Sequence, residues 1–369
     1  MNIARPIADL AGRLIGEIKA NQNGLVVCPA TLCASALTVF PAMTSEVQSN
    51  IALWLGQTPE TLPDFASAFR DLEVDLRRRQ GLEWAYCNRV WLRSDPADRD
   101  NWLRIRHLLP STMEPMDFSR DTRMVADAIN ERVAEETMGH IASAVAPEDI
   151  TEGLSILTIS ALWMYSKWAA PFNKQNTHKG YFHCGNGGLR QVPFMGQTGA
   201  FKVAKENGMS CLRIPLECPG IEVEIAMPDG VANEGVLRAC LSRGLKDVLF
   251  AAAECDERQV RMVIPAMTWG CSFDIAAVIG GLLPNGTNGH ANGGHTVSAA
   301  VQYALVSMNE DGLGVASATT MASTGGVSEE NLVVFVLDRP FVFLVKDLAT
   351  GLILSCGYVL DPGGEGELR

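Results

Sequence analysis

The chain has 369 residues, of which 47% are hydrophobic and 20% charged, and its formal net charge is -12. This composition supports a large buried core, although length alone would also allow two domains. The negative charge argues against nucleic acid or a polyanion as a partner. No apolar run reaches the roughly 18 to 20 residues of a membrane span, so we expect a soluble protein with no membrane partner.

The first predicted element is an amphipathic helix that starts almost at Met1. Apolar residues recur at helical spacing, with charged residues between them: Ile7, Leu10, Leu14, Ile15 and Ile18. A secretory signal would need an apolar core of about 7 to 15 residues behind positive charge. Charges interrupt this segment throughout. We therefore expect a helix and a cytoplasmic protein, with secretion as the alternative.

Ten cysteines are scattered along the chain without CxxC or other paired spacing. Free buried thiols in a reducing compartment are the simpler interpretation. On that interpretation the sequon Asn285-Gly286-Thr287 lies by accident in a loop rich in Gly and Asn, and is not a glycan site.

One concentration of basic residues occurs at Arg77-Arg78-Arg79. Consecutive residues on a helix point about 100° apart, so these three cannot form one continuous stripe. Asp71, Glu73 and Asp75 also lie nearby. The pattern favours a solvated, partly salt-bridged face over a polyanion site.

Motifs for enzyme chemistry are weak in this sequence. It contains no GxSxG, P-loop or HExxH pattern, and its six histidines do not fall at metal-ligand spacing. His290 and His295 lie in a Gly/Asn-rich run that is typical of a solvated turn. We therefore predict no catalytic residue, no metal and no cofactor.

The most informative segment lies near the C-terminus. Alternating Val301, Tyr303 and Leu305 predict one β-strand, and the apolar run 333–337 predicts another. Between them, residues 316–331 are mostly small or polar and offer almost nothing to bury. Structureless loops beyond roughly 12 to 15 residues are uncommon in compact domains and are usually functional or linkers. Because strands anchor both ends, the segment predicts a tethered, exposed arch.

This arch resembles the reactive-centre loop of the serpin family. Met308-Asn309-Glu310-Asp311-Gly312 is similar to the strand end before that loop, and Val315–Thr319 to its small-residue hinge. Downstream, Arg339-Pro340-Phe341 and Leu354–Val359, with Asp361-Pro362, are similar to the family's last strands.

The resemblance extends back through most of the chain. Residues 27–37 resemble the start of helix B, and 129–133 with Thr137, Gly139 and Ile141 resemble helix F. Further matches follow in the family's order: Lys167-Trp168, Pro171-Phe172, Thr177, Phe182-His183, Val192-Pro193-Phe194-Met195 and Met227-Pro228-Asp229-Gly230. The chain is thus identified as a suspected serpin. This implies an α+β serpin fold with three β-sheets, about nine helices and an exposed reactive-centre loop at about 312–332, in one monomeric domain of residues 1–369.

The resemblance also implies a function, that of a protease inhibitor and not an enzyme. A serine or cysteine protease would attack the loop, form an acyl-enzyme and be trapped when the cut loop inserts into sheet A. The alternative is a serpin-fold binding or storage protein that does not inhibit. The implied hinge comprises Gly312, Leu313, Gly314, Val315, Ala316, Ser317, Ala318 and Thr319.

Two hinge residues depart from the family pattern of a small residue after the glycine and Ala two positions later. Leu313 and Val315 occupy these positions, and strand alternation places them with Ser317 and Thr319 on the face that turns inward on insertion. We expect the bulk of Leu313 to slow the first step of insertion by overpacking, at a cost of roughly 1 to 3 kcal/mol.

Two further sites follow from the resemblance. The polar network that closes sheet A in the family would here comprise Cys28, Thr31, Ser160 and Gln302, which predicts a rebuilt network. The scissile bond, counted forward from Gly312, falls at Gly326-Val327. Counting back from Pro340 gives Glu329-Glu330 instead, and cleavage after Met321, Thr324 or Val327 also stays open.

Overall fold

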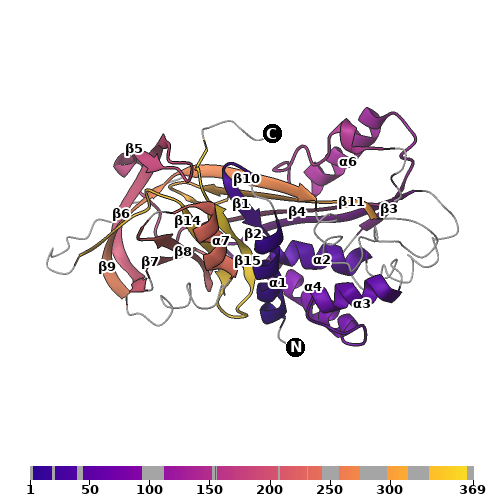
Figure 1. Cartoon of the computed structure of the whole chain (residues 1–369), viewed down its shortest axis with the longest axis horizontal. Helices are drawn as coiled ribbons and strands as arrows, with labels where there is room; N and C mark the ends of the chain where they lie inside the picture. The colour runs from indigo at the N-terminus through magenta and orange to yellow at the C-terminus, as the bar shows by residue number, and fades with distance from the viewer. Residues whose placement is uncertain are drawn as a thin grey trace.

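The computed structural model describes residues 3–18, 21–39, 45–93, 112–151, 154, 156–206, 208–230, 232–242, 257–274, 297–314 and 332–363. These residues form two β-sheets with helices packed against them (Figure 1).

The described residues contain six α-helices: α1 (Ala4–Glu17), α2 (Pro29–Val39), α3 (Ser45–Trp54), α4 (Leu62–Arg78), α6 (Thr122–Glu136) and α7 (Glu234–Ser242). Two short 3-10 turns, η2 (Pro147–Asp149) and η3 (Lys174–Asn176), complete the helical structure. About nine helices were expected, whereas the described residues contain six. Residues 94–111, 243–256 and 275–296 lie outside the described chain. The amphipathic N-terminal helix is confirmed as α1, whose five spaced apolar residues are at most 2% exposed.

The larger sheet has nine strands in the order β1-β15-β14-β8-β7-β6-β9-β13, with β5 also paired to β6. The strands are β1 (Gly24–Val27), β5 (His178–His183), β6 (Leu189–Glu206), β7 (Met209–Pro215), β8 (Ile221–Pro228), β9 (Glu257–Pro265), β13 (Val333–Val336), β14 (Phe341–Asp347) and β15 (Ile353–Val359).

The smaller sheet has six strands in the order β10-β11-β12-β4-β2-β3. They are β2 (Glu83–Arg93), β3 (Thr112–Met116), β4 (Ile156–Lys167), β10 (Met267–Asp274), β11 (Val297–Met308) and β12 (Gly312–Leu313). The described strands thus form two sheets and not the expected three. The reason is β6, whose 18 residues pair with β5, β7 and β9 and so join what would be two sheets into one.

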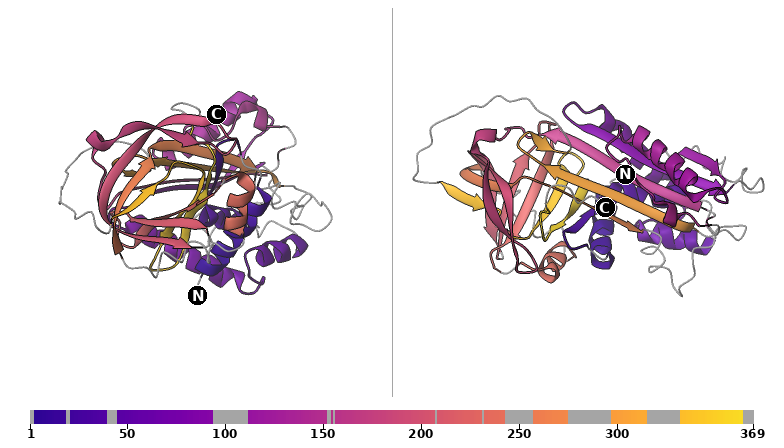
Figure 2. Two further views of the ribbon diagram at one scale, coloured as in Figure 1. Left: turned by 60° about the vertical axis from the view of Figure 1, so that its left-hand side comes forward. Right: turned by 90° about the horizontal axis from the view of Figure 1, so that it is seen from above.

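The six-stranded sheet carries helices on both faces, with α2 and α4 on one side and α6 on the other (Figures 1 and 2). Strand β4 shows how alternation produces this layering. Its Leu162 joins the main core with residues of α2 and α4, whereas Ile159 and Ala161 pack with Ile129 of α6. None of the helices in the described ranges is long and apolar enough to cross a membrane.

Candidate functional site

The predicted hinge begins inside the six-stranded sheet. Strand β12 lies between β11 and β4, with Leu313 opposite Met308 on one side and Ser166 on the other, and Gly312 opposite Lys167. Leu313 is 2% exposed and belongs to the main hydrophobic core. The first two hinge residues therefore already occupy the position of an inserted strand.

Gly314 follows β12 directly. Its N–H donates to the Ser307 carbonyl at 2.6 Å, and its φ of +132° lies in a region that favours glycine. A Cβ at this position would lie 2.4 Å from Cδ2 of Tyr165 and 2.6 Å from its Cα. Local geometry therefore requires glycine at 314.

The turn before β12 is fastened to the segment that follows β4. The Asn309 carbonyl accepts from Nε1 of Trp168 at 2.7 Å, and the Asp311 carbonyl accepts from the Trp168 N–H at 3.1 Å. Glu310 accepts from the Thr177 hydroxyl at 2.6 Å, and Lys174 pairs with Asp311 at 3.0 Å. The motif residues that suggested the strand end are thus the ones that fix the base of the hinge.

The position of Leu313 revises the expected role of its bulk. The sequence suggested that Leu313 would slow the first step of insertion. In the structure Leu313 already lies between β11 and β4, opposite Met308, and belongs to the main core. Its apolar side chain therefore stabilises the seated hinge, because burial of a leucine side chain is favourable by roughly 1.5 to 3 kcal/mol.

Aromatic side chains line the sheet beside the hinge. His140, which follows α6, stacks on Trp163 with ring centroids 3.7 Å apart, and Trp163 stacks with Tyr165 at 6.4 Å. Burial lowers the pKa of His140, partly opposed by Glu83. Burial also raises the pKa of Tyr165, and Asp311 adds to that rise. Uncharged rings therefore pack on β4 beside the hinge.

Three of the four residues predicted to close the sheet, Cys28, Thr31 and Ser160, lie close together. Ser160 Oγ lies 3.1 Å from Asn88 Oδ1 and 3.3 Å from the Thr31 carbonyl, and it makes a short contact with Ser35 Oγ. The Thr31 hydroxyl donates to the Cys28 carbonyl at 2.8 Å, and the Cys28 thiol lies 3.9 Å from Ser355 Oγ.

Gln302 is the fourth residue of the predicted set. It lies opposite Ser160 in the parallel pairing of β11 with β4. Its side chain lies outside the described part of the structure.

Two members of the network were missed by sequence reasoning. Ser35 lies four residues after Thr31 on α2, so helical periodicity places both on one face. Asn88 lies opposite Ser160 in the antiparallel pairing of β2 with β4. The spacing of Ser35 could have been found in the sequence; the register that brings Asn88 to Ser160 could not.

The rest of the predicted loop lies outside the described residues. This applies to Val315, Ala316, Ser317, Ala318 and Thr319, and likewise to the expected scissile bond Gly326-Val327. The described chain resumes at residue 332, just before β13.

The basic run at the end of α4 is partly engaged in ion pairs. Arg79 lies 2.7 Å from Asp75 and 2.8 Å from the buried Asp347, while Arg77 lies 3.9 Å from Glu73. These contacts agree with the predicted salt-bridged face.

Comparisons with known proteins match this architecture. The family model described as serpin (serine protease inhibitor) matches residues 6–362. An uncharacterized serpin-like protein of Thermococcus kodakarensis is 25% identical over 95% of this chain and 83% of its own, and mouse serpin B11 is 26% identical over 80% of this chain and 78% of its own. The crystal structure of uncleaved ovalbumin superposes with a TM-score of 0.83 at 18% identity, covering 98% of this chain and 100% of that one.

The chain therefore belongs to the serpin family and has the serpin fold. This is a family of protease inhibitors, whose members are normally not enzymes, in agreement with the prediction from the sequence.

Proposed function

We propose that this protein inhibits a serine or cysteine protease as a suicide substrate, by inserting its cleaved reactive-centre loop between β11 and β4. The observation that carries the proposal is the position of Leu313, seated between these two strands in antiparallel pairing with both. Relatives named antithrombin-III and plasminogen activator inhibitor 1 add support through shared family.

The register of the two flanking strands favours continued insertion. Leu313 lies opposite Met308 and Ser166, and an extended chain that kept this antiparallel register would bring Ser317 opposite both Ala304 and Leu162. Ala304 and Leu162 already lie opposite each other in the parallel pairing of β11 with β4. The strands would therefore need to separate but not to slide.

The same register explains the size pattern of the hinge sequence. Residues 313, 315, 317 and 319 would face the main core, and Thr319 would reach Ser160 and Gln302, where the sheet-closing network lies. The alternate positions, Gly314, Ala316 and Ala318, would face the opposite side, beside Tyr165 and Trp163. Small residues thus fall where the sheet carries bulky aromatic rings.

The length of the strand edges limits where cleavage is productive. The two edges start at Ile156 on β4 and Val297 on β11, so an inserted strand in this register would run from Gly312 to about residue 323. Cleavage after Met321 would leave that strand short. The register favours a bond beyond Thr324, such as Gly326-Val327, which remains our proposed reactive bond.

A panel of serine and cysteine proteases tests this function. An inhibitor should give, with at least one protease that cuts the loop, a covalent complex that survives SDS. If every protease that cuts the loop releases only cleaved protein, the alternative of a non-inhibitory serpin-fold binding or storage protein is favoured. We further propose that the protein acts as a monomer in the cytoplasm; an expressed, epitope-tagged chain found outside the cell would contradict that location.

A further inference from the structure

A buried acidic residue lies on α4, away from the hinge. Glu73 is 4% exposed, and neither oxygen of its carboxylate has a hydrogen-bond partner among the described residues. Arg77 lies 3.9 Å away, too far for a hydrogen bond, and its side chain is 48% exposed. Burial of a carboxylate without hydrogen bonds is costly, so a ligand with hydrogen-bond donors would stabilise this group.

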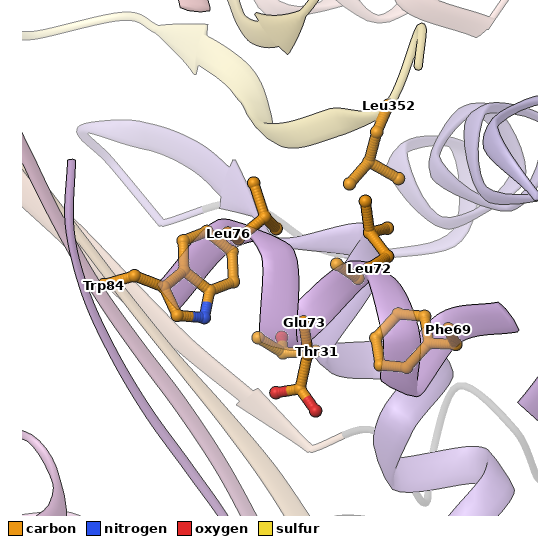
Figure 3. A pocket seen from close by; sticks show the side chains of 8 residues that line it. Thr31, Phe69, Leu72, Glu73, Leu76, Trp84 and Leu352 are labelled. Atoms are coloured by element: carbon orange, nitrogen blue, oxygen red, sulfur yellow. The ribbon is translucent and has the colours of Figure 1, made fainter. Parts of the chain in front are cut away.

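The carboxylate borders a cavity between α4, α2, β2 and the β14–β15 connection (Figure 3). The space between atoms is about 240 Å³, part of it open to solvent, and the interior has room for about one water molecule. Apolar groups dominate the lining, and the indole Nε1 of Trp84 also has no partner within the described chain. The lining residues are Ala30, Thr31, Phe69, Leu72, Glu73, Leu76, Trp84 and Leu352.

We propose that this α4 cavity binds an ammonium ion, with Glu73 as the counter-ion. An ammonium ion is close to a water molecule in size and offers four N–H donors, which suits a carboxylate that lacks donors. A hard metal cation fits poorly, because it requires about six oxygen ligands.

The charge state of Glu73 sets the pH range of binding. Burial raises the pKa of Glu73 to about 7, opposed by Arg77. Thr31 from α2, Trp84 from β2 and Leu352 from the β14–β15 connection also face the cavity, and none of them titrates near neutral pH. An ammonium ion stays protonated through neutral pH, because its pKa, like that of the lysine ammonium group, lies well above 7. Binding should therefore strengthen as the pH rises through 7.

Calorimetric titration of the full chain with ammonium chloride tests the proposal. Tetramethylammonium chloride is the control for a cation without N–H donors, and sodium chloride is the control for ionic strength. We expect binding at pH 8 by ammonium alone. The apparent affinity at pH 6 should be about tenfold weaker than at pH 8, in proportion to the ionised fraction of Glu73. Absence of binding at pH 8, or equal affinity at both pH values, would overturn the proposal.

Three variants locate the site. Glu73→Gln keeps the shape but removes the charge, and should abolish binding without loss of folding. Ala30→Val fills the cavity but keeps the charge, and should also abolish it. Glu131→Gln removes one exposed carboxylate on α6 and should bind like wild type. Binding that survives Glu73→Gln, or that is lost in Glu131→Gln, would show general attraction to an acidic protein and contradict the assigned site.

Discussion

Gly314 lies so close to Tyr165 that a Cβ at position 314 would fall 2.4 Å from the tyrosine ring. Together with the hydrogen bond from the Gly314 N–H to the Ser307 carbonyl, this contact places Gly314 tightly between β11 and β4. Gly314 thus lies immediately beside Tyr165, which stacks with Trp163.

Replacement of Gly314 by Ala should dislodge the hinge. The φ of +132° and the contact with the Tyr165 backbone make any side chain strained, at a cost of about 1 to 3 kcal/mol. Hydrogen exchange of the Leu313 and Gly314 amides should accelerate accordingly. Gly230→Ala is the control, because a Cβ at Gly230 would meet nothing within 4 Å. Unchanged exchange in Gly314→Ala would contradict the seated geometry.

Two replacements of Leu313 test whether the hinge residue between the strands has to be uncharged. Leu313→Thr should leave the hinge in the sheet, whereas Leu313→Arg would bury an unpaired charge and should expel it, at a cost of several kcal/mol. Against a protease that cuts the loop, Leu313→Arg should then shift the outcome from trapped complex to cleaved product. The ratio of the two products on SDS gels measures this shift. An equal ratio in wild type and Leu313→Arg would show that insertion does not decide the outcome.

The stability of the protein should depend on pH through Glu73. Its pKa is about 7 in the folded chain and 4.5 as an isolated group, so between these values the folded state holds a proton that the unfolded state has lost. Stability should therefore fall by about 2 to 3 kcal/mol as the pH rises from 4.5 to 7, and level off above. Melting temperatures of wild type and Glu73→Gln across this window should converge at low pH and separate at high pH. Parallel curves would refute the assignment of the step to Glu73.

The cysteines should be free thiols. None of the eight cysteines that the structure describes forms a disulfide, and seven of them are buried. Burial raises the pKa of Cys33 and Cys356 far above the ordinary value, so these thiols should react only after unfolding. Titration with a thiol reagent should find few reactive groups in the native protein and nearly all ten after denaturation. Protected pairs in the denatured, unreduced protein would contradict the prediction of a reducing compartment.

The sequence predicted those features that depend on local patterns. Apolar spacing predicted α1, and the run 333–337 predicted β13, because periodicity reports which face is buried. Ordered motifs predicted the fold family. The acidic residues 310 and 311 of one such motif fix the base of the hinge, a role that the sequence did not predict.

Features set by pairing between distant strands could not be predicted. The seating of Leu313 depends on the register of β11 and β4, which are far apart in the chain. The same applies to Asn88, which reaches Ser160 only through the pairing of β2 with β4. The union of the expected second and third sheets depends on the length of β6, which pairs with three different strands.

The melting temperature of the protein before and after a confirmed cut near Gly326 tests loop insertion most directly. If the cleaved loop continues from Leu313 between β11 and β4, the sheet gains a central strand with its hydrogen bonds and burial, and the cut protein should melt far above the intact one. Equal melting temperatures after complete cleavage would contradict insertion.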